Sequence, residues 1–233
     1  MKRFWKRGEA IADEGGHWRI ELDGRPVRTP VRALLLLPGE PLAAAVAAEW
    51  DSAGETIDPR AMPLTGLANA ALDHVAPRPG DFADGLARYA NSDLLCYRAD
   101  SPDKLIAAQA DAWDPLLQWA RRRFDVDFAV THGVSPVEQP QATLDRLGQA
   151  VHAFDAFTLA GLSPLVTVGG SLIAALALHE GAVGVDDAWQ SVSLDERWQL
   201  DQWGADDEAE KAMAAREADF RAGARFLELL PAA

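Results

Sequence analysis

The sequence contains one cysteine, Cys96, among 233 residues. A single cysteine excludes an internal disulfide and a cysteine-rich zinc site, and it fits a reducing compartment. Basic residues are also scarce, because 22 lysines and arginines stand against 36 aspartates and glutamates, for a formal net charge of -14. Nucleic-acid-binding proteins usually show the opposite balance or a basic stripe. We therefore expect no nucleic-acid partner, and instead a partner with a basic or apolar face.

We also expect no targeting signal. The N-terminus is basic, but it lacks the apolar core and the small-residue cleavage site of a secretory signal, and it is too short for an organelle presequence. Residues 156–178 carry no charge and are long enough to span a bilayer. However, Ser163-Pro164 and Gly169-Gly170 interrupt this run. We expect two short buried helices that meet there, with no stable membrane insertion, in a cytoplasmic protein.

Catalytic motifs are absent too. Gly169-Gly170 lacks the following lysine and hydroxyl residue of a phosphate-binding loop, and His179-Glu180 does not continue as a His-Glu-x-x-His metal motif. The five histidines are scattered along the chain, so we expect no metal site. Cys96 follows two leucines, which indicates a small buried residue rather than a reactive thiolate. These observations favour a protein without catalysis, metal or cofactor.

An enzyme whose site forms only in three dimensions remains open as an alternative. It would be a hydrolase that uses aspartate and histidine side chains from separate segments. The residues that would have to converge are His74, Asp93, His132 and His179.

What the chain does contain begins with short strand-like runs divided by glycine and proline, at residues 9–12, 17–22, 27–29 and 33–37. Within 17–22, apolar and polar residues alternate, as in a strand that is buried on one face. The strongest turn signal is Asp23-Gly24 ahead of Arg25-Pro26. Proline has no amide donor, so this segment belongs at a sheet edge.

Helical spacing of apolar residues predominates afterwards, with helices expected at 40–51, 64–74, 81–90, 102–123, 141–154, 186–203 and 206–230. Ser101 is the expected N-cap of the long helix, with Pro102 at its first position. Extended segments are expected at 56–62, 94–98 and 124–132. Strands followed by helices predict an α+β fold, with a small N-terminal antiparallel-sheet lobe and then an all-helical orthogonal bundle. Pro77-Arg78-Pro79-Gly80 is the clearest break, which predicts domains at 1–79 and 80–233.

Eight tryptophans give the chain its most useful positive feature. Most are expected in the core, but tryptophan is also enriched at protein interfaces. The strongest candidate surface is residues 194–210, where Glu196, Gln199 and Trp203 fall at i, i+3 and i+7 on one helix face. Gly204 is the expected end of that helix, and acids including Glu208 begin the next one. Such a face would bind a basic or polar segment of a partner.

Seven short motifs occur in a characteristic order, which is Arg3-Phe4-Trp5-Lys6, Leu22-Asp23-Gly24-Arg25-Pro26-Val27-Arg28-Thr29-Pro30, Glu49-Trp50-Asp51, Met62-Pro63-Leu64-Thr65, Asp93-Leu94-Leu95-Cys96-Tyr97-Arg98, Trp113-Asp114-Pro115-Leu116-Leu117 and Trp203-Gly204. Together they resemble the assembly chaperones of the F-type ATP synthase that hold the unassembled alpha subunit of the catalytic head. The resemblance covers nearly the whole chain.

The resemblance implies a binding role rather than catalysis. Such a chaperone shields the surface of a free alpha subunit that later faces a beta subunit, and so prevents aggregation before the hexamer forms. The family fold, a small α+β lobe followed by a helical bundle, agrees with the order of elements above. The resemblance places Trp50 in an N-terminal pattern and Glu196, Gln199 and Trp203 in a C-terminal one. With Glu208, these are the expected partner-binding residues of a monomeric, bacterial, cytoplasmic member.

Overall fold

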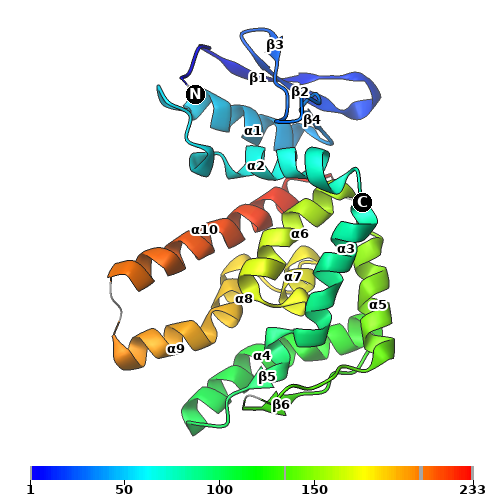
Figure 1. The fold of residues 1–233 in the computed structure, drawn as a ribbon, viewed down its shortest axis with the longest axis vertical. Coiled ribbons are helices and arrows are strands. Elements are labelled where there is room, and N and C mark those ends of the chain that lie inside the picture. Colours follow the sequence, from blue (N-terminus) through cyan, green and yellow to red (C-terminus); the bar gives the residue numbers. More distant parts are fainter. Residues whose placement is uncertain (1, 134, 205–206, 232–233) are drawn as a thin grey trace. The chain divides into compact units, whose positions relative to one another are not determined.

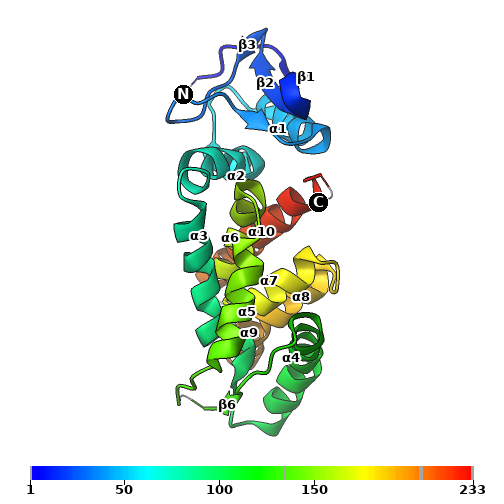
Figure 2. The same cartoon turned by 90° about the vertical axis from the view of Figure 1, so that its right-hand side faces the viewer.

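The computed structural model describes residues 2–133, 135–204 and 207–231. The chain divides into two compact units, each assembled from separate stretches of sequence. The sheet unit contains the chain up to Pro79, Asp155–Gly161 and the chain from Arg225 onward, and the helical unit contains Gly80–Phe154 and Leu162–Ala224. These elements confirm the α+β class (Figures 1 and 2). Whether 1–79 and 80–233 fold as separate domains stays a prediction.

The sheet unit is built around one central strand. Its antiparallel strands are β1 (Gly8–Ala12), β2 (Trp18–Leu22), β3 (Arg25–Pro26) and β4 (Leu36–Leu37). β2 pairs with β1 along its whole length and with the short β3 and β4 at its two ends. Ile20 and Leu22 are buried while Trp18 is half-buried, which confirms the predicted alternation.

The Asp23-Gly24 turn is a two-residue hairpin loop between β2 and β3. Asp23 has φ 49° and Gly24 has φ 77°, the pair of positive values that such tight loops require. The turn prediction is therefore confirmed, and β3 lies at an edge of the sheet order. The strand expected at 27–29 is wrong, since only an isolated bridge joins Arg28 to Leu34. Pro30 has no amide hydrogen with which to extend that pairing.

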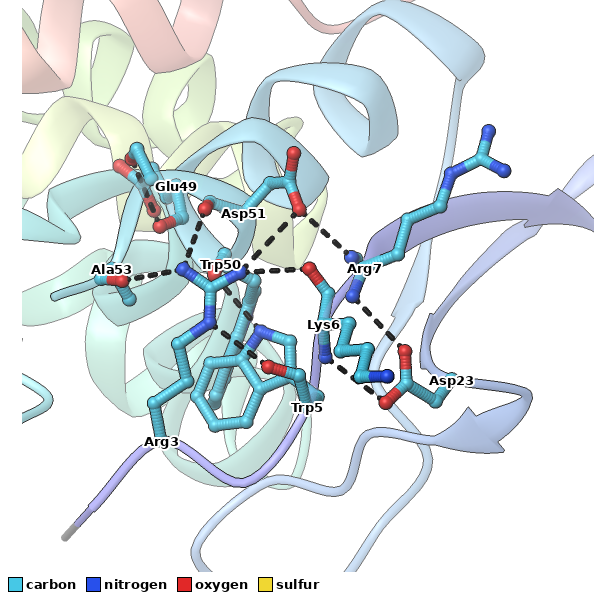
Figure 3. A network of polar contacts seen from close by, with 11 residues as sticks. Arg3, Trp5, Lys6, Arg7, Asp23, Glu49, Trp50, Asp51 and Ala53 are labelled. Atoms are coloured by element: carbon cyan, nitrogen blue, oxygen red, sulfur yellow. Dashed lines mark hydrogen bonds and ion pairs between the residues drawn. The ribbon is translucent and has the colours of Figure 1, made fainter. Parts of the chain in front are cut away.

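The N-terminal segment is attached to the sheet unit by a polar network (Figure 3). The Asp23 carboxylate accepts hydrogen bonds from the backbone N–H groups of Lys6 and Arg7, both at 3.0 Å. The same bonds hold the pKa of Asp23 below its usual value. The Arg3 guanidinium donates to four backbone carbonyls, those of Trp5, Lys6, Asp51 and Ala53. Arg3 thus binds the N-terminal segment to the end of α1 (Glu40–Ser52).

Glu49 connects α1 to α2 (Pro63–Ala70) by capping the second helix. Met62, the N-cap residue, offers no capping side chain. Instead, Glu49 accepts the N–H of Leu64 at 2.8 Å and both the N–H and the hydroxyl of Thr65, at 2.8 and 2.7 Å. The first N–H groups of a helix have no partner within the helix, so a carboxylate from another element satisfies them here. The motifs at 49–51 and 62–65 therefore belong to one contact.

The core of the sheet unit includes residues from distant parts of the sequence. Apolar side chains of the sheet and of α1, such as Ile20, Leu37 and Leu42, pack with Phe226 and Leu229 from the end of the chain. Phe157 stacks on Phe226 with ring planes 8° apart. Gly161 makes this approach possible, because a Cβ there would lie 2.7 Å from the Leu227 side chain. Residues 155–161 and 225–231 are therefore part of this core.

The helical unit holds most of the remaining elements. Its helices are α3 (Pro79–Ala87, whose first residue belongs to the sheet unit), α4 (Asp103–Phe124), α5 (Gln141–His152), the later part of α6 (Ala156–Gly169), α7 (Leu172–His179), α8 (Val185–Val192), α9 (Leu194–Trp203) and the earlier part of α10 (Asp207–Glu228). Two short strands, β5 (Tyr97–Arg98) and β6 (Thr131–His132), pair in parallel. The buried helix α7 packs against α4 and α8, so it forms the centre of this unit (Figure 2).

Asp93 fixes the start of α7. Its carboxylate is fully buried and accepts the N–H of Leu95 at 3.1 Å and the N–H of Ile173 at 3.0 Å. Ser171 adds a conventional N-cap, because its hydroxyl accepts the N–H of Ala174. Gly170, with φ 67°, separates α6 from α7 and confirms the predicted break in the apolar run. Among the described helices, none is long and apolar enough to cross a membrane.

Four other expectations are corrected. Residues 94–96 form a 3-10 turn, capped by Asp93, and only Tyr97–Arg98 is a strand. The segment at 56–62 contains a 3-10 turn, Pro59–Ala61, with Asp58 as its cap. Pro102, rather than Ser101, is the N-cap of α4. The helix expected at 186–203 is two helices, because the backbone of Ser193, with φ -98° and ψ 7°, departs from the helical conformation between them. Asp206 lies outside the described residues.

We predict that Glu49→Ala lowers the free energy of unfolding by about 2 kcal/mol, because two buried backbone N–H groups lose their acceptor. Urea unfolding followed by circular dichroism measures this difference. Glu55→Ala is the matched control, since Glu55 is an exposed acid of the same unit, and it should change stability by less than about 0.5 kcal/mol. Equal stability of the two variants would show that the cap contributes nothing.

Candidate functional site

The candidate surface lies on α9 and at the start of α10, at one edge of the helical unit (Figure 1). Glu196, Gln199 and Trp203 share one face of α9, as their spacing predicts. Gln199 is exposed, and Trp203 has 80% of its surface accessible to solvent. Exposure of a tryptophan ring to water is unfavourable in free energy relative to its burial, since the indole ring is a large apolar group. We call these three residues, together with Glu208, the Trp203 surface.

Glu196 is bound within the helical unit by an ion pair to Arg216 of α10. Arg216 also donates to the Val168 carbonyl near the end of α6, at 3.0 Å. Both members of the ion pair are partly exposed, so the pair stabilises the fold only modestly. It fixes the position of α9 relative to α10, and it leaves part of the Glu196 carboxylate accessible.

The first turn of α9 has a second support. Gln109 of α4 donates to the Asp195 carboxylate at 2.7 Å and accepts the N–H of Ala99 at 2.8 Å. Gln109 is almost completely buried. Sequence patterns did not identify Gln109 or Arg216 as supports of this surface. Their partners lie 86 and 20 residues away in sequence, and neither belongs to a local motif.

The end of α9 presents Trp203 next to a helix stop. Gly204 has φ 82° and its N–H bonds to the Leu200 carbonyl, which confirms the predicted C-cap glycine. Glu208 is exposed in the first turn of α10, beside two more acids, Asp207 and Glu210. Acidic side chains are favourable at a helix N-terminus, so these positions also have a structural reason. An exposed aromatic ring therefore lies at the end of α9, and several carboxylates lie in the first turn of α10.

Trp50 has a different setting in the sheet unit. Its half-buried ring packs edge-on against Trp5, with ring centroids 5.3 Å apart. Its backbone carbonyl accepts the Trp5 indole N–H at 3.1 Å. The buried indole N–H of Trp50 has no acceptor among the described residues. These contacts give Trp50 a packing role, and its contact with a partner stays a prediction.

The residues of the alternative hydrolase have separate surroundings. Asp93 is used as a cap, and burial raises its pKa to about 6 despite the hydrogen bonds that it accepts. His132 is exposed and contacts the Ala99 carbonyl at 3.4 Å, whereas His179 packs its ring edge-on against Phe154. His74 is exposed in the sheet unit. These contacts give Asp93, His132 and His179 local structural roles.

Cys96 is fully buried, and burial raises the pKa of its thiol to about 12. The thiol is therefore protonated at neutral pH, which confirms that it is a small core residue and not a reactive thiolate. No cluster of histidine, cysteine and acidic side chains suited to a metal ion occurs in the described part of the chain.

Comparisons with known proteins agree with one another. A family model described as the ATP12 chaperone protein matches residues 2–121. The crystal structure of Atp12 from Paracoccus denitrificans is 44% identical in sequence, with a TM-score of 0.93, and the match covers 99% of this chain and 98% of that one. A chaperone candidate from Agrobacterium tumefaciens is 37% identical, with a TM-score of 0.92 and coverage of 97% and 85%.

We predict that ionisation of Asp93 makes the protein less stable as pH rises. The folded pKa of about 6 lies above the usual value of 3.8, so the folded state binds the proton more tightly between these values. The stability from this proton is complete below about pH 4 and is lost as pH rises through 6. Asp93→Asn cannot titrate, so the stability of the natural protein relative to this variant should increase by about 1 kcal/mol from pH 7 to pH 5. A pH-independent difference in urea unfolding would contradict this account.

Proposed function

The chain belongs to the ATP12 chaperone family of ATP synthase assembly chaperones, and we propose that it binds the unassembled alpha subunit of the catalytic sector. By covering the surface that later faces a beta subunit, it prevents the alpha subunit from aggregating before the hexamer forms. In this proposal the protein acts as a monomer in the cytoplasm. It performs no catalysis and needs no cofactor.

The observation that carries the proposal is the exposure of Trp203. A chaperone for one client needs an apolar anchor that is available before the client arrives. Trp203 provides a large ring with 80% of its surface exposed on a supported helix. Tryptophan is among the residues most often found to dominate binding energy at protein interfaces.

The neighbours of Trp203 suggest the chemistry of the client segment. Gln199 offers an amide that both donates and accepts hydrogen bonds, and Glu208 adds a carboxylate at the start of α10. Glu196 would contribute the part of its carboxylate that the Arg216 ion pair leaves accessible. This combination suits an apolar client segment with basic or polar residues beside it.

Trp50 is the proposed contact of the sheet unit. Its half-exposed ring offers apolar area, while its packing on Trp5 keeps the ring rigid. A rigid aromatic side chain loses little conformational entropy on binding. Trp50 would therefore add to the affinity without carrying the main anchor.

A light-scattering assay of purified alpha subunit under mild heating tests the proposed function. The natural protein should suppress the increase in scattering and should co-purify with the alpha subunit. Trp203→Ala should bind the alpha subunit about 30-fold more weakly, which corresponds to the roughly 2 kcal/mol typical of an interface hot spot. Its melting temperature should stay unchanged, because Trp203 is 80% exposed.

Phe4→Ala is the matched control for this experiment. Phe4 is another exposed aromatic residue, with 65% of its surface accessible, but it lies in the sheet unit. Its loss should leave suppression within about twofold of the natural protein. Absence of both suppression and co-purification would disprove the proposed function. Equal effects of the two substitutions would instead remove Trp203 as the anchor.

A further inference from the structure

A groove in the helical unit lies between α4 on one side and α8 and α9 on the other. Its volume is about 410 Å³. The α4 side supplies Pro115, Leu116 and the half-buried ring of Trp119, and the α9 side supplies Leu194. Trp119 is held in place by an edge-on contact with Phe124. The groove therefore has an apolar floor with one fixed aromatic ring.

Two carboxylates line the same groove from opposite sides, Asp111 on α4 and Asp187 on α8. Both are exposed, and neither forms a side-chain hydrogen bond or an ion pair with the described part of the chain. Gln190 adds an exposed side-chain amide, and two other polar groups of the groove are already used. Arg197 donates to the Ser193 hydroxyl and the Gln190 carbonyl, and the Ser191 hydroxyl donates to the Asp187 backbone carbonyl. The groove therefore offers two available carboxylates and one amide beside an aromatic ring.

We propose that this groove binds an arginine side chain on a basic segment of a partner protein. A guanidinium is planar, donates several hydrogen bonds in fixed directions and stacks on aromatic rings, so it matches carboxylates and a tryptophan at once. Lysine provides a point charge without the planar surface, and it therefore uses the ring less well. The apolar floor accommodates the methylene groups of the arginine stem.

The excess of negative charge in residues 80–233 supports arginine as the side chain that binds in the groove. Residues 80–233 contain 12 basic and 25 acidic residues, whereas residues 1–79 contain 10 and 11. Nearly all of the net negative charge therefore belongs to the part of the sequence that forms the groove. Such a field attracts a basic segment and repels an acidic one before contact is made.

The groove is separate from the Trp203 surface. On an α-helix, successive residues are rotated by about 100°, so the groove residues Leu194 and Arg197 lie on nearly the opposite face of α9 from Gln199 and Trp203. Binding at the groove needs only an arginine-bearing peptide and does not depend on which protein carries it. The two surfaces can therefore be tested independently.

The test is a titration of the full-length protein with the peptide acetyl-Gly-Arg-Gly-amide, followed by the NMR resonance of the Trp119 indole N–H. Trp119→Phe assigns that resonance. The peptide should shift it in a saturable manner. The same peptide with citrulline in place of arginine should bind at least about tenfold more weakly, because citrulline keeps the shape and loses the charge. The double variant Asp111→Asn, Asp187→Asn should also lose about tenfold in affinity.

A second double variant, Glu138→Gln with Asp219→Asn, is the matched control. It removes the same charge from exposed positions of the helical unit that do not line the groove. Its affinity for the arginine peptide should stay within about twofold of the natural protein, and melting temperatures show that both double variants are folded. Unaltered binding by the Asp111 and Asp187 variant, equal binding of the citrulline peptide, or no saturable shift would each overturn the proposal.

Discussion

The fold depends on carboxylates that accept backbone N–H groups from elements far away in the sequence. Glu49 of α1 caps α2, and the buried Asp93 holds the start of α7, 80 residues further along. Asp23 does the same for the N-terminal segment at Lys6 and Arg7. Glu49 and Asp93 satisfy donors that would otherwise lie unpaired in a partly or fully buried place, which would cost roughly 1–3 kcal/mol per group. These contacts join local elements into units.

The sequence predicts the elements that depend on local rules. Alternation identifies β2, the Asp23-Gly24 pair identifies its hairpin, and the uncharged run at 156–178 separates at Gly170 as expected. Sequence patterns fail where a capping side chain or the backbone conformation of one residue determines the local structure. Residues 94–96 are apolar enough for a strand, yet Asp93 caps them into a 3-10 turn. Ser193 ends a helix within a strongly helical pattern, because its backbone, with φ -98° and ψ 7°, departs from the helical conformation.

Most residues that identify the family differ from those proposed to contact a partner. Most motifs that identify the family hold the structure together, as Glu49 does with Thr65 and as Trp113 does through its indole N–H bond to the Ser191 carbonyl. Arg98 is almost completely buried against the Trp113 ring and bonds to Asp114. Sequence motifs could therefore identify the family without locating the partner surface. The candidate surface was found by helical spacing alone, and its supports, Gln109 and Arg216, required the three-dimensional structure.

The central claim is that the buried family motifs shape the scaffold, while an exposed aromatic end of α9 contacts the client. Hydrogen–deuterium exchange of the protein with and without the unassembled alpha subunit tests this claim most directly, because it reports on backbone amides along the chain in one experiment. The account predicts added protection at residues 194–204 and in the first turns of α10. It also predicts unchanged exchange at the already protected start of α7. Unchanged exchange along α9 on formation of a stable complex would contradict the account.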